Sequence, residues 1–289
     1  MTKLKYLIEA ALMQFLFTLF KILPLDMASF VGGFIARTLG PLLPLPAHRI
    51  AKQNLAMVFP ELTAKERDKI LTGMWDNLGR VAAELPHLPG DKLVKRITTN
   101  GGENMPTEGH QVFFFSGHLG NWELLPSVAL SYHVPVALAY KLAKNPYTDK
   151  IIATLRTRHT TSMFAKGPTG GIKLARAIKG GQSLAMLVDQ KMNEGIPVPF
   201  FGRDAMTAPA IAQLALRYNK PIVPTRVRRM GGCHFIADIY PPLQFTKTGD
   251  DEKDTAGIMK TINGYLEQWI REHPDQWFWV HQRWPKDGY

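Results

Sequence analysis

Cysteine is almost absent from this sequence of 289 residues, in which Cys233 is the single one. One cysteine excludes an intrachain disulfide framework and a metal site built from several thiolates, and it suits a chain that folds in a reducing compartment. Internal repeats and low-complexity segments are missing as well. With 45% hydrophobic and 20% charged residues, the composition excludes wholesale disorder and is typical of a folded globule.

Long apolar runs are also scarce. The uncharged stretch over 10–20 is shorter than the roughly 20 apolar residues of a membrane-spanning helix, and Glu9 and Lys21 flank it. A second apolar stretch, over 27–45, is interrupted by Arg37, glycines and prolines. The composition disfavours a polytopic membrane protein. The two stretches predict an N-terminal pair of helices that lies in the lipid interface or crosses the bilayer once by tilting.

The N-terminal segment, residues 1–45, allows other interpretations. No small-residue cleavage site follows the first stretch, so a retained membrane anchor is expected rather than a removed signal peptide. The alternative is a pair of core helices beneath the main domain. We expect a hydrophobic, membrane-associating segment over 1–45 and one further domain over 46–289.

Acidic residues are outnumbered by basic ones. The chain has 35 Lys and Arg residues against 24 Asp and Glu residues, a net charge of +11. Such an excess favours nucleic acid, an anionic membrane, a phosphorylated substrate or an acidic protein as partner, although solvated surface charge also explains the clusters at 141–166 and 220–229. The aromatic residues do not interleave with these clusters as in single-strand binders, so nucleic acid is the poorest candidate.

Short apolar runs alternate with helical stretches beyond Gly101. The capping box Thr63-Ala-Lys-Glu66 predicts a helix that runs to about Leu85. Strands are expected at 112–115, 134–140, 184–188, 221–227 and 235–240, and helices at 121–132, 147–158, 170–179, 207–218 and 253–272. This alternation predicts an α/β fold in which a single domain contains a mixed β-sheet flanked by helices.

Common catalytic signatures are missing. Phe114 and His118 occupy the glycine positions of a G-x-S-x-G nucleophile elbow around Ser116, and Walker A and H-E-x-x-H motifs do not occur. The glycine-rich segment 167–171 suits a phosphate cradle at a helix start, but a simple turn explains it equally well.

The segment from 113 to 123 carries the strongest chemical signal. An apolar strand ends in Ser-Gly, and His118 follows where strand gives way to helix, the edge at which open α/β sheets bind ligands. Glu123 lies five positions further on, about 140° away on an ideal helix, so the two side chains meet only if His118 sits in the preceding turn. A carboxylate on one imidazole nitrogen would leave the other nitrogen basic, able to take a proton from a substrate hydroxyl.

Tryptophans gather near the C-terminus, at positions 277, 279 and 284. Their amphipathic rings suit a membrane interface. The alternation of Trp277, Trp279 and His281 equally suits a final strand packed on the core.

His118-x-x-x-x-Glu123 resembles the H-x4-D/E motif of the glycerolipid and lysophospholipid acyltransferase superfamily. The wider pattern is similar to its lipid A branch, the late (secondary) acyltransferases that add a fatty acid to the hydroxyacyl chains of the lipopolysaccharide anchor. The matching segments occur in the same order over nearly the whole chain: the apolar N-terminus, 54–60, 140–149, 155–158, 186–190, 198–202 and 277–284.

The resemblance implies a catalytic acyltransferase domain over 46–289 on the cytoplasmic face of the bacterial inner membrane. It implies transfer of a fatty acyl group from acyl carrier protein to a hydroxyl of a Kdo–lipid IVA-type lipid A precursor, with no cofactor, metal or covalent acyl-enzyme. His118 would be the general base and Glu123 its partner. Further residues are implied at the oxyanion or the substrates: Arg156, Arg158, Asp189, Asn121 and Lys141.

The sequence departs from the family pattern in two places. Lys141 follows Tyr140 where the family usually has arginine, which removes a bidentate donor for phosphate or carboxylate. The segment 190–195 also differs from enterobacterial members. Both differences leave acyl-chain and acceptor specificity open.

Three other functions remain open from the sequence. The same chemistry could act on a lysophospholipid, an ornithine lipid or a phosphatidylinositol mannoside. A non-catalytic protein could bind anionic lipid or a carrier protein through its basic surface. A metal hydrolase could use His118, Glu123 and Asp189 as ligands.

Overall fold

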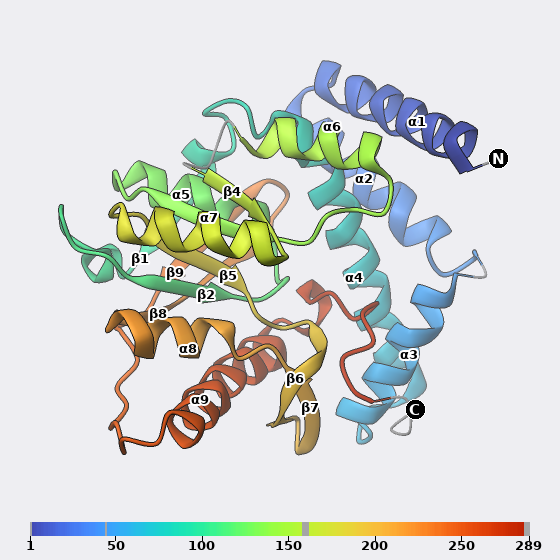
Figure 1. Ribbon diagram of the computed structural model, residues 1–289. Coiled ribbons are helices and arrows are strands. Elements are labelled where there is room, and N and C mark those ends of the chain that lie inside the picture. The colour runs from blue at the N-terminus through green and yellow to red at the C-terminus, as the bar shows by residue number, and fades with distance from the viewer. Residues whose placement is uncertain (1, 44, 158–161, 286–289) are drawn as a thin grey trace.

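A seven-stranded sheet forms the centre of the computed structural model, which describes residues 2–43, 45–157 and 162–285 (Figure 1). Neighbouring strands are parallel except for the antiparallel pair β8 and β9, so the sheet is mixed, as predicted. The strand order is β1 (Ile97–Asn100), β9 (His234–Ile239), β8 (Ile222–Gly231), β2 (Phe113–Ser116), β5 (Ser183–Leu187), β3 (Val136–Tyr140) and β4 (Ser162–Ala165).

Both faces of the sheet are covered by helices. Successive apolar side chains of a strand point to opposite faces, so each face has apolar groups to bury. In β2, Phe113 and Phe115 belong to one buried cluster and Phe114 to another. The first cluster lies against α7 (Pro168–Lys179), α8 (Ala210–Tyr218) and α9 (Asp251–Glu272), and the second against α5 (Leu125–Ser131). The central strands are therefore buried on both sides.

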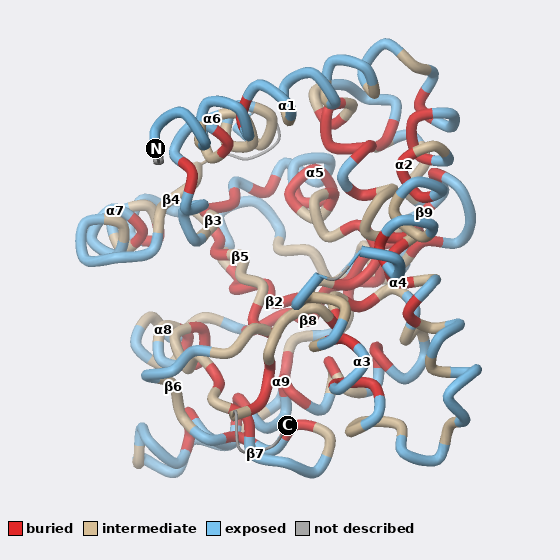
Figure 2. Tube along the Cα trace, turned by 90° about the vertical axis from the view of Figure 1, so that its right-hand side faces the viewer, coloured by how far each residue is buried: buried red, intermediate tan, exposed pale blue. Residues whose placement is uncertain are grey.

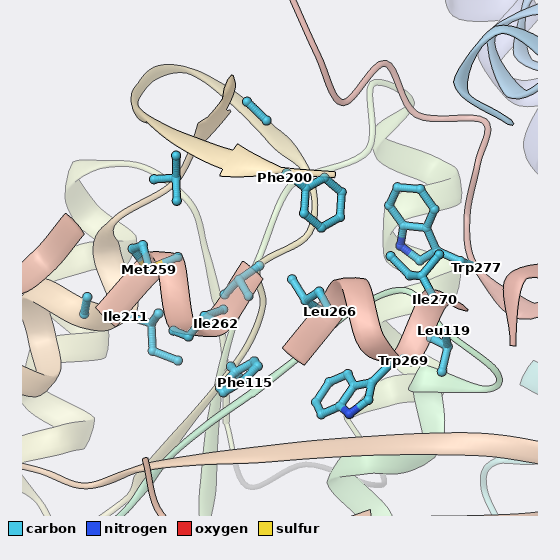
Figure 3. Close-up of a cluster of buried hydrophobic side chains, with 14 of the residues drawn as sticks. Phe115, Leu119, Phe200, Ile211, Met259, Ile262, Leu266, Trp269, Ile270 and Trp277 are labelled. Atoms are coloured by element: carbon cyan, nitrogen blue, oxygen red, sulfur yellow. The ribbon is translucent and has the colours of Figure 1, made fainter. Parts of the chain in front are cut away.

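Helix α9 carries much of the first cluster (Figure 3). Asp250 caps it by accepting hydrogen bonds from the N–H groups of Glu252 and Lys253, as expected for an acidic helix start. Trp269 stacks on Phe115 with ring centroids 5.8 Å apart. This contact ties α9 to β2, the strand that leads into the loop of His118.

Four helices precede the sheet: α1 (Thr2–Ile22), α2 (Leu25–Leu39), α3 (Pro46–Val58) and α4 (Ala64–Glu84). The Thr63/Glu66 capping box opens α4, as predicted. Helices α2 and α4 touch through their backbones, because a Cβ added to Gly79 would lie 2.2 Å from the carbonyl oxygen of Gly32. Only glycine allows this approach.

The outer surfaces of α1 and α2 are apolar. Helix α1 is exposed along most of its length (Figure 2). The large apolar side chains exposed on the two helices are Leu4, Leu7, Ile8, Leu12, Phe15, Leu16, Leu19, Ile22, Met27, Phe30, Phe34, Ile35 and Leu39. Among the residues that the structure describes, no helix combines the length and apolarity needed to cross a bilayer.

The C-terminal tryptophans do not lie at a membrane interface. Trp277, Trp279 and Trp284 are 2%, 0% and 1% exposed. They pack in the first cluster, although not as a strand, since Trp277 forms only an isolated bridge with Leu119. The alternative of core packing is confirmed: the rings of Trp277 and Trp284 contact Phe200 in a hairpin over 191–207, and the ring of Trp279 contacts Phe59.

That hairpin, β6 (Lys191–Phe200) and β7 (Arg203–Thr207), was not expected from the sequence. Strands β1 and β4 and helix α3 were not expected either. The predicted helix over 147–158 is α6 (Pro146–Arg156), and the predicted helix over 121–132 is the short 3-10 turn η4 (Trp122–Leu124) followed by α5. The predicted elements thus differ from the observed ones by a few residues at their boundaries, whereas five elements, β1, β4, β6, β7 and α3, were not predicted at all. The mixed sheet flanked by helices is unchanged by these additions.

Candidate active site

The loop after β2 places His118 at the carboxyl edge of the sheet. Gly120 has φ +58°, and a Cβ at this position would lie 2.0 Å from the carbonyl oxygen of Val227. Only glycine fits both constraints, so the turn is fixed by the sequence. The N–H of Gly120 bonds the carbonyl of Gln276, and the carbonyl of His118 accepts the N–H of Phe278.

His118 is paired with Asp189. Its Nδ1 lies 2.7 Å from Oδ1 of the carboxylate, and its backbone N–H donates to Oδ2 at 2.8 Å. The indole Nε1–H of Trp277 also donates to Oδ2, at 2.8 Å. Burial alone would raise the pKa of Asp189, but the charge and hydrogen bonds of His118 and the Trp277 hydrogen bond outweigh it and lower the pKa to about 2.

This geometry corrects the predicted pairing of His118 with Glu123. The carboxylate of Glu123 accepts two hydrogen bonds from the guanidinium of Arg156, with Nε 2.8 Å from Oε2, and one from the indole of Trp122 at 3.1 Å. The physical reason is strand register. Ser116 pairs with Leu187 across β2 and β5, so the first residues beyond both strands, including Asp189, lie beside His118.

Only some of the other predicted site residues line the cavity that contains His118. Arg156 and Lys141 line the same cavity as His118, whereas Asn121 is buried beneath the loop at 1% exposure and does not line it. Its side chain accepts the N–H of Glu123 and donates to Glu84, so its position is not that of a substrate ligand. Arg158 lies outside the described residues.

The cavity has a volume of about 300 Å³, in the range of small-molecule sites. The polar residues of its lining are Ser116, His118, Glu123, Tyr140, Lys141, Arg156, Lys166, Gln190, Thr225, Arg226 and Asp238. The remaining lining is largely apolar and extends between the sheet and α5 to β9, with Ala129, Ala185 and Ala237 among its small residues. Such a shape can hold an apolar chain with its reactive end at His118.

Gln190 is a site residue that the sequence did not single out. Its side-chain Nε2 lies 3.5 Å from Nε2 of His118, the nitrogen that faces away from Asp189. The backbone N–H of the following residue, Lys191, donates to Nε2 of His281 at 2.9 Å, so this nitrogen is the acceptor. Burial lowers the pKa of His281. The signal that could have found Gln190 is its place directly after Asp189.

A buried ionic network beneath the loop was also missed. Glu84 is fully buried and binds the guanidinium of Arg229, with Nη1 2.6 Å and Nη2 3.0 Å from its two oxygens. The same carboxylate accepts hydrogen bonds from Asn121 at 2.7 Å and from Ser29 of α2 at 2.6 Å. Asn77 links the Arg229 Nε to the carbonyl of Gly120. The network joins α2, α4 and β8 to the loop that holds His118.

Replacing Glu84 by leucine is expected to lower the free energy of unfolding by about 3–5 kcal/mol, because the guanidinium of Arg229 would stay buried without its carboxylate. Chemical denaturation followed by circular dichroism measures this loss. The matched control is Asp68→Asn, which removes an exposed carboxylate from the pair with Lys52 and should change unfolding little. A Glu84→Leu protein as stable as the control would contradict the structural role of the network.

The three arginines of the basic cluster at 220–229 do not form an open binding surface. Arg226 and Arg229 are buried and paired with Asp238, Glu272 and Glu84. Arg228 also binds Asp238.

No metal centre is formed by the described residues, since no three His, Cys, Asp or Glu side chains among them are placed to share an ion. The ligand set considered from the sequence is divided: Asp189 faces His118, and Glu123 faces Arg156.

Comparison with known proteins identifies the family. The family model described as bacterial lipid A biosynthesis acyltransferase matches residues 1–286. A lipid A biosynthesis palmitoleoyltransferase of Escherichia coli K12 is 25% identical over 271 residues, covering 90% of this chain and 86% of the relative. A lipid A biosynthesis myristoyltransferase of the same strain is 24% identical over 244 residues, covering 81% and 74%.

A solved structure was also matched, that of the 1-acyl-sn-glycerophosphate (LPA) acyltransferase PlsC from Thermotoga maritima. It has 14% identity and a TM-score of 0.37, with coverage of 84% of this chain and 97% of that one.

An α/β domain with a histidine–aspartate pair at the mouth of an apolar cavity suits the transfer of a lipid-linked group. The chain belongs to the bacterial lipid A biosynthesis acyltransferase family, and it is an acyltransferase.

Proposed function

We propose that this acyltransferase moves a fatty acyl group from an acyl carrier protein thioester to a hydroxyl of a Kdo–lipid IVA-type lipid A precursor. The observation that supports this most directly is the pairing of His118 with a buried, ionised Asp189 at the mouth of an apolar cavity. The carboxylate accepts the Nδ1–H of His118, so Nε2 carries the lone pair and faces the cavity.

In the proposed mechanism, Nε2 of His118 takes the proton of the acceptor hydroxyl as its oxygen attacks the thioester carbonyl carbon. The new C–O bond forms, the C–S bond breaks, and the imidazolium returns its proton to the leaving thiolate. Asp189 stabilises the transient imidazolium. The acyl group passes directly to the acceptor, so no covalent acyl-enzyme forms.

The developing oxyanion needs hydrogen-bond donors at the cavity mouth. The loop amides of His118, Leu119 and Gly120 all donate to other partners. Gln190 lies beside His118, and Arg156 uses Nε and one Nη for Glu123 out of its five N–H donors. We assign oxyanion stabilisation to these two side chains and the positioning of Arg156 to Glu123.

The membrane-facing part of this proposal rests on α1 and α2. Their exposed apolar side chains suit insertion into the interfacial region of a bilayer, which amphipathic helices occupy in the membrane plane. The positive net charge of +11 suits the anionic cytoplasmic leaflet of the inner membrane. Residues 1–45 would then act as the membrane-associating segment of the catalytic domain over 46–289.

The test is an assay of the purified protein with carrier-protein thioesters of graded chain length and a lipid A precursor, followed by mass spectrometry. The expected product is a precursor heavier by one acyl group. Lysophospholipid, ornithine lipid and phosphatidylinositol mannoside serve as alternative acceptors. Transfer to one of these and not to the lipid A precursor would refute the proposed acceptor.

The far end of the cavity should limit acyl-chain length. Ala237 lies on β9, two strands away from β2 and so about 10 Å across the sheet from it. Ala237→Leu is expected to lower kcat/KM for the longest accepted chain about 10- to 100-fold relative to chains a few carbons shorter, since each displaced methylene costs about 0.8 kcal/mol. Competition between thioesters measures the ratio.

Ala64→Leu is the control for that substitution, because Ala64 is exposed at the start of α4 and adds the same bulk away from the cavity. An unchanged chain-length ratio in Ala237→Leu would show that the acyl chain lies elsewhere.

A further inference from the structure

Two lysines end adjacent strands at the mouth of the cavity. Tyr140 of β3 pairs with Ala165 of the parallel strand β4, and the N–H of Lys166 donates to the carbonyl of Tyr140 at 2.8 Å. Lys141 and Lys166 are therefore the next residues on two neighbouring strands. Both line the cavity that contains His118, and both are exposed at its mouth.

Neither ammonium group has an acidic partner among the residues that the structure describes. Glu123, the acid of the cavity mouth, is held by Arg156, and Asp149 of α6 accepts the N–H of Ala143. Partial desolvation by the surrounding cavity wall, and then repulsion by Lys141, lower the pKa of Lys166 although part of its side chain is exposed. Two positive charges thus follow paired strand ends in one cavity lining, with no carboxylate among the described residues to pair with either.

An anion is the ligand that this arrangement favours. Like charges on adjacent strands are unfavourable, and a bound anion converts the repulsion into two charge-assisted hydrogen bonds. A phosphate group has enough oxygens and charge to bind two ammonium groups at once. Lysine serves as a point-charge ligand for phosphate where the bidentate fork of arginine is not required.

We propose that Lys141 and Lys166 together bind a phosphate group of one of the two substrates while its reacting atom lies at His118. The proposal rests on the proposed transferase function and adds the chemistry recognised at the mouth. A phosphate has two sources here: a phosphate ester on a sugar of the acceptor, or the phosphodiester that links the acyl-bearing arm of the donor to its carrier.

The consequence for the reaction is positional. Because the phosphate lies away from the reacting atoms, its contacts with the two lysines would be equally strong in the ground state and the transition state. Loss of the lysines should therefore raise KM and leave kcat nearly unchanged.

Lys141→Gln, Lys166→Gln and the double variant test this proposal. The controls are Lys150→Gln on α6 and Lys173→Gln on α7, which are exposed and lie outside the cavity lining. Kinetics are measured with a phosphorylated acceptor, the same acceptor after phosphatase treatment, a carrier-protein thioester, and an acyl thioester of N-acetylcysteamine, which has no phosphate. The double variant is expected to raise KM for the phosphate-bearing partner by about 10-fold or more, since hydrogen bonds to charged groups contribute about 1.5–3 kcal/mol.

The four substrates separate the two sources. If the variant effect disappears with the dephosphorylated acceptor, the acceptor phosphate is bound; if it disappears with the N-acetylcysteamine thioester, the donor phosphodiester is bound. A double variant whose KM values equal those of the wild type for all four substrates would overturn the site.

A binding measurement without turnover separates this proposal from the proposed function. Isothermal calorimetry at low salt with inorganic pyrophosphate should show binding to the wild type and to both controls, and binding at least about 10-fold weaker to the double variant. This result would support the phosphate site even if no lipid A precursor were acylated. If the wild type does not bind pyrophosphate, the phosphate site is overturned, whatever the result of the acyl-transfer assay.

Discussion

Replacing His118 by alanine is expected to lower kcat about 10³- to 10⁴-fold, because the acceptor hydroxyl loses the base that takes its proton. The fold should persist, since the carbonyl of residue 118 still accepts the N–H of Phe278 and its N–H still donates to Asp189. Mass spectrometry of the acylated product gives the rate, and circular dichroism reports the fold.

His110→Ala is the matched control, because His110 is exposed, lies outside the cavity lining and forms a ring hydrogen bond with the nearby Thr107. This control should keep full activity. A His118→Ala protein that retains more than about a tenth of the wild-type kcat would contradict general-base catalysis by this side chain.

Asp189→Asn is expected to lower kcat about 10³-fold or more with little change in structure. Oδ2 of Asp189 accepts two N–H groups, from the His118 backbone and the Trp277 indole, so the asparagine oxygen must keep that position. Its NH₂ group would then face Nδ1 of His118 and donate to it. The proton of the imidazole would move to Nε2, and the base would be lost.

Glu123→Gln provides the comparison that decides which carboxylate assists His118. The kcat of Glu123→Gln should fall by no more than about 10-fold. Glu123 contacts Arg156 and not His118, so its replacement leaves the histidine tautomer unchanged. Losses of kcat of equal size in Glu123→Gln and Asp189→Asn would refute Asp189 as the carboxylate that assists His118.

The pH dependence of the wild type follows from the lowered pKa of Asp189. With a pKa of about 2 against an ordinary value of 3.8, this carboxylate is ionised at any practical assay pH. Its contribution to folding is fully present above about pH 4 and is lost as the pH falls toward 2. Protonation of Asp189 therefore does not set an acid limb of the rate profile near neutrality.

The main architecture was predictable from the sequence because the central strands are buried apolar runs. Strands β2, β3, β5, β8 and β9 all fall within a few residues of their expected ranges. The elements that were missed lack this signal. Strand β1 alternates half-buried and exposed residues over a short span, and β6 contains Gly195, Pro197 and Pro199, which normally argue against a strand.

The site was predictable in part. The strand-end position located His118, and the family resemblance suggested Asp189, but the pairing between them spans 71 residues and depends on which strands are neighbours. Proximity in sequence favoured Glu123 instead. The parallel pairing of β2 with β5 brings the ends of both strands to one edge of the sheet. Hydrophobic periodicity along one strand does not predict which strands are neighbours.

The backbone contact between α2 and α4 has a consequence for regiochemistry. Gly32 and Gly79 hold the two helices together, and Asn77 and Glu84 of α4 hold the loop that carries His118. In the membrane-bound enzyme proposed above, the reactive nitrogen would therefore sit at a constant depth below the lipid headgroups. The hydroxyl that is acylated would be the one that the membrane presents at that depth.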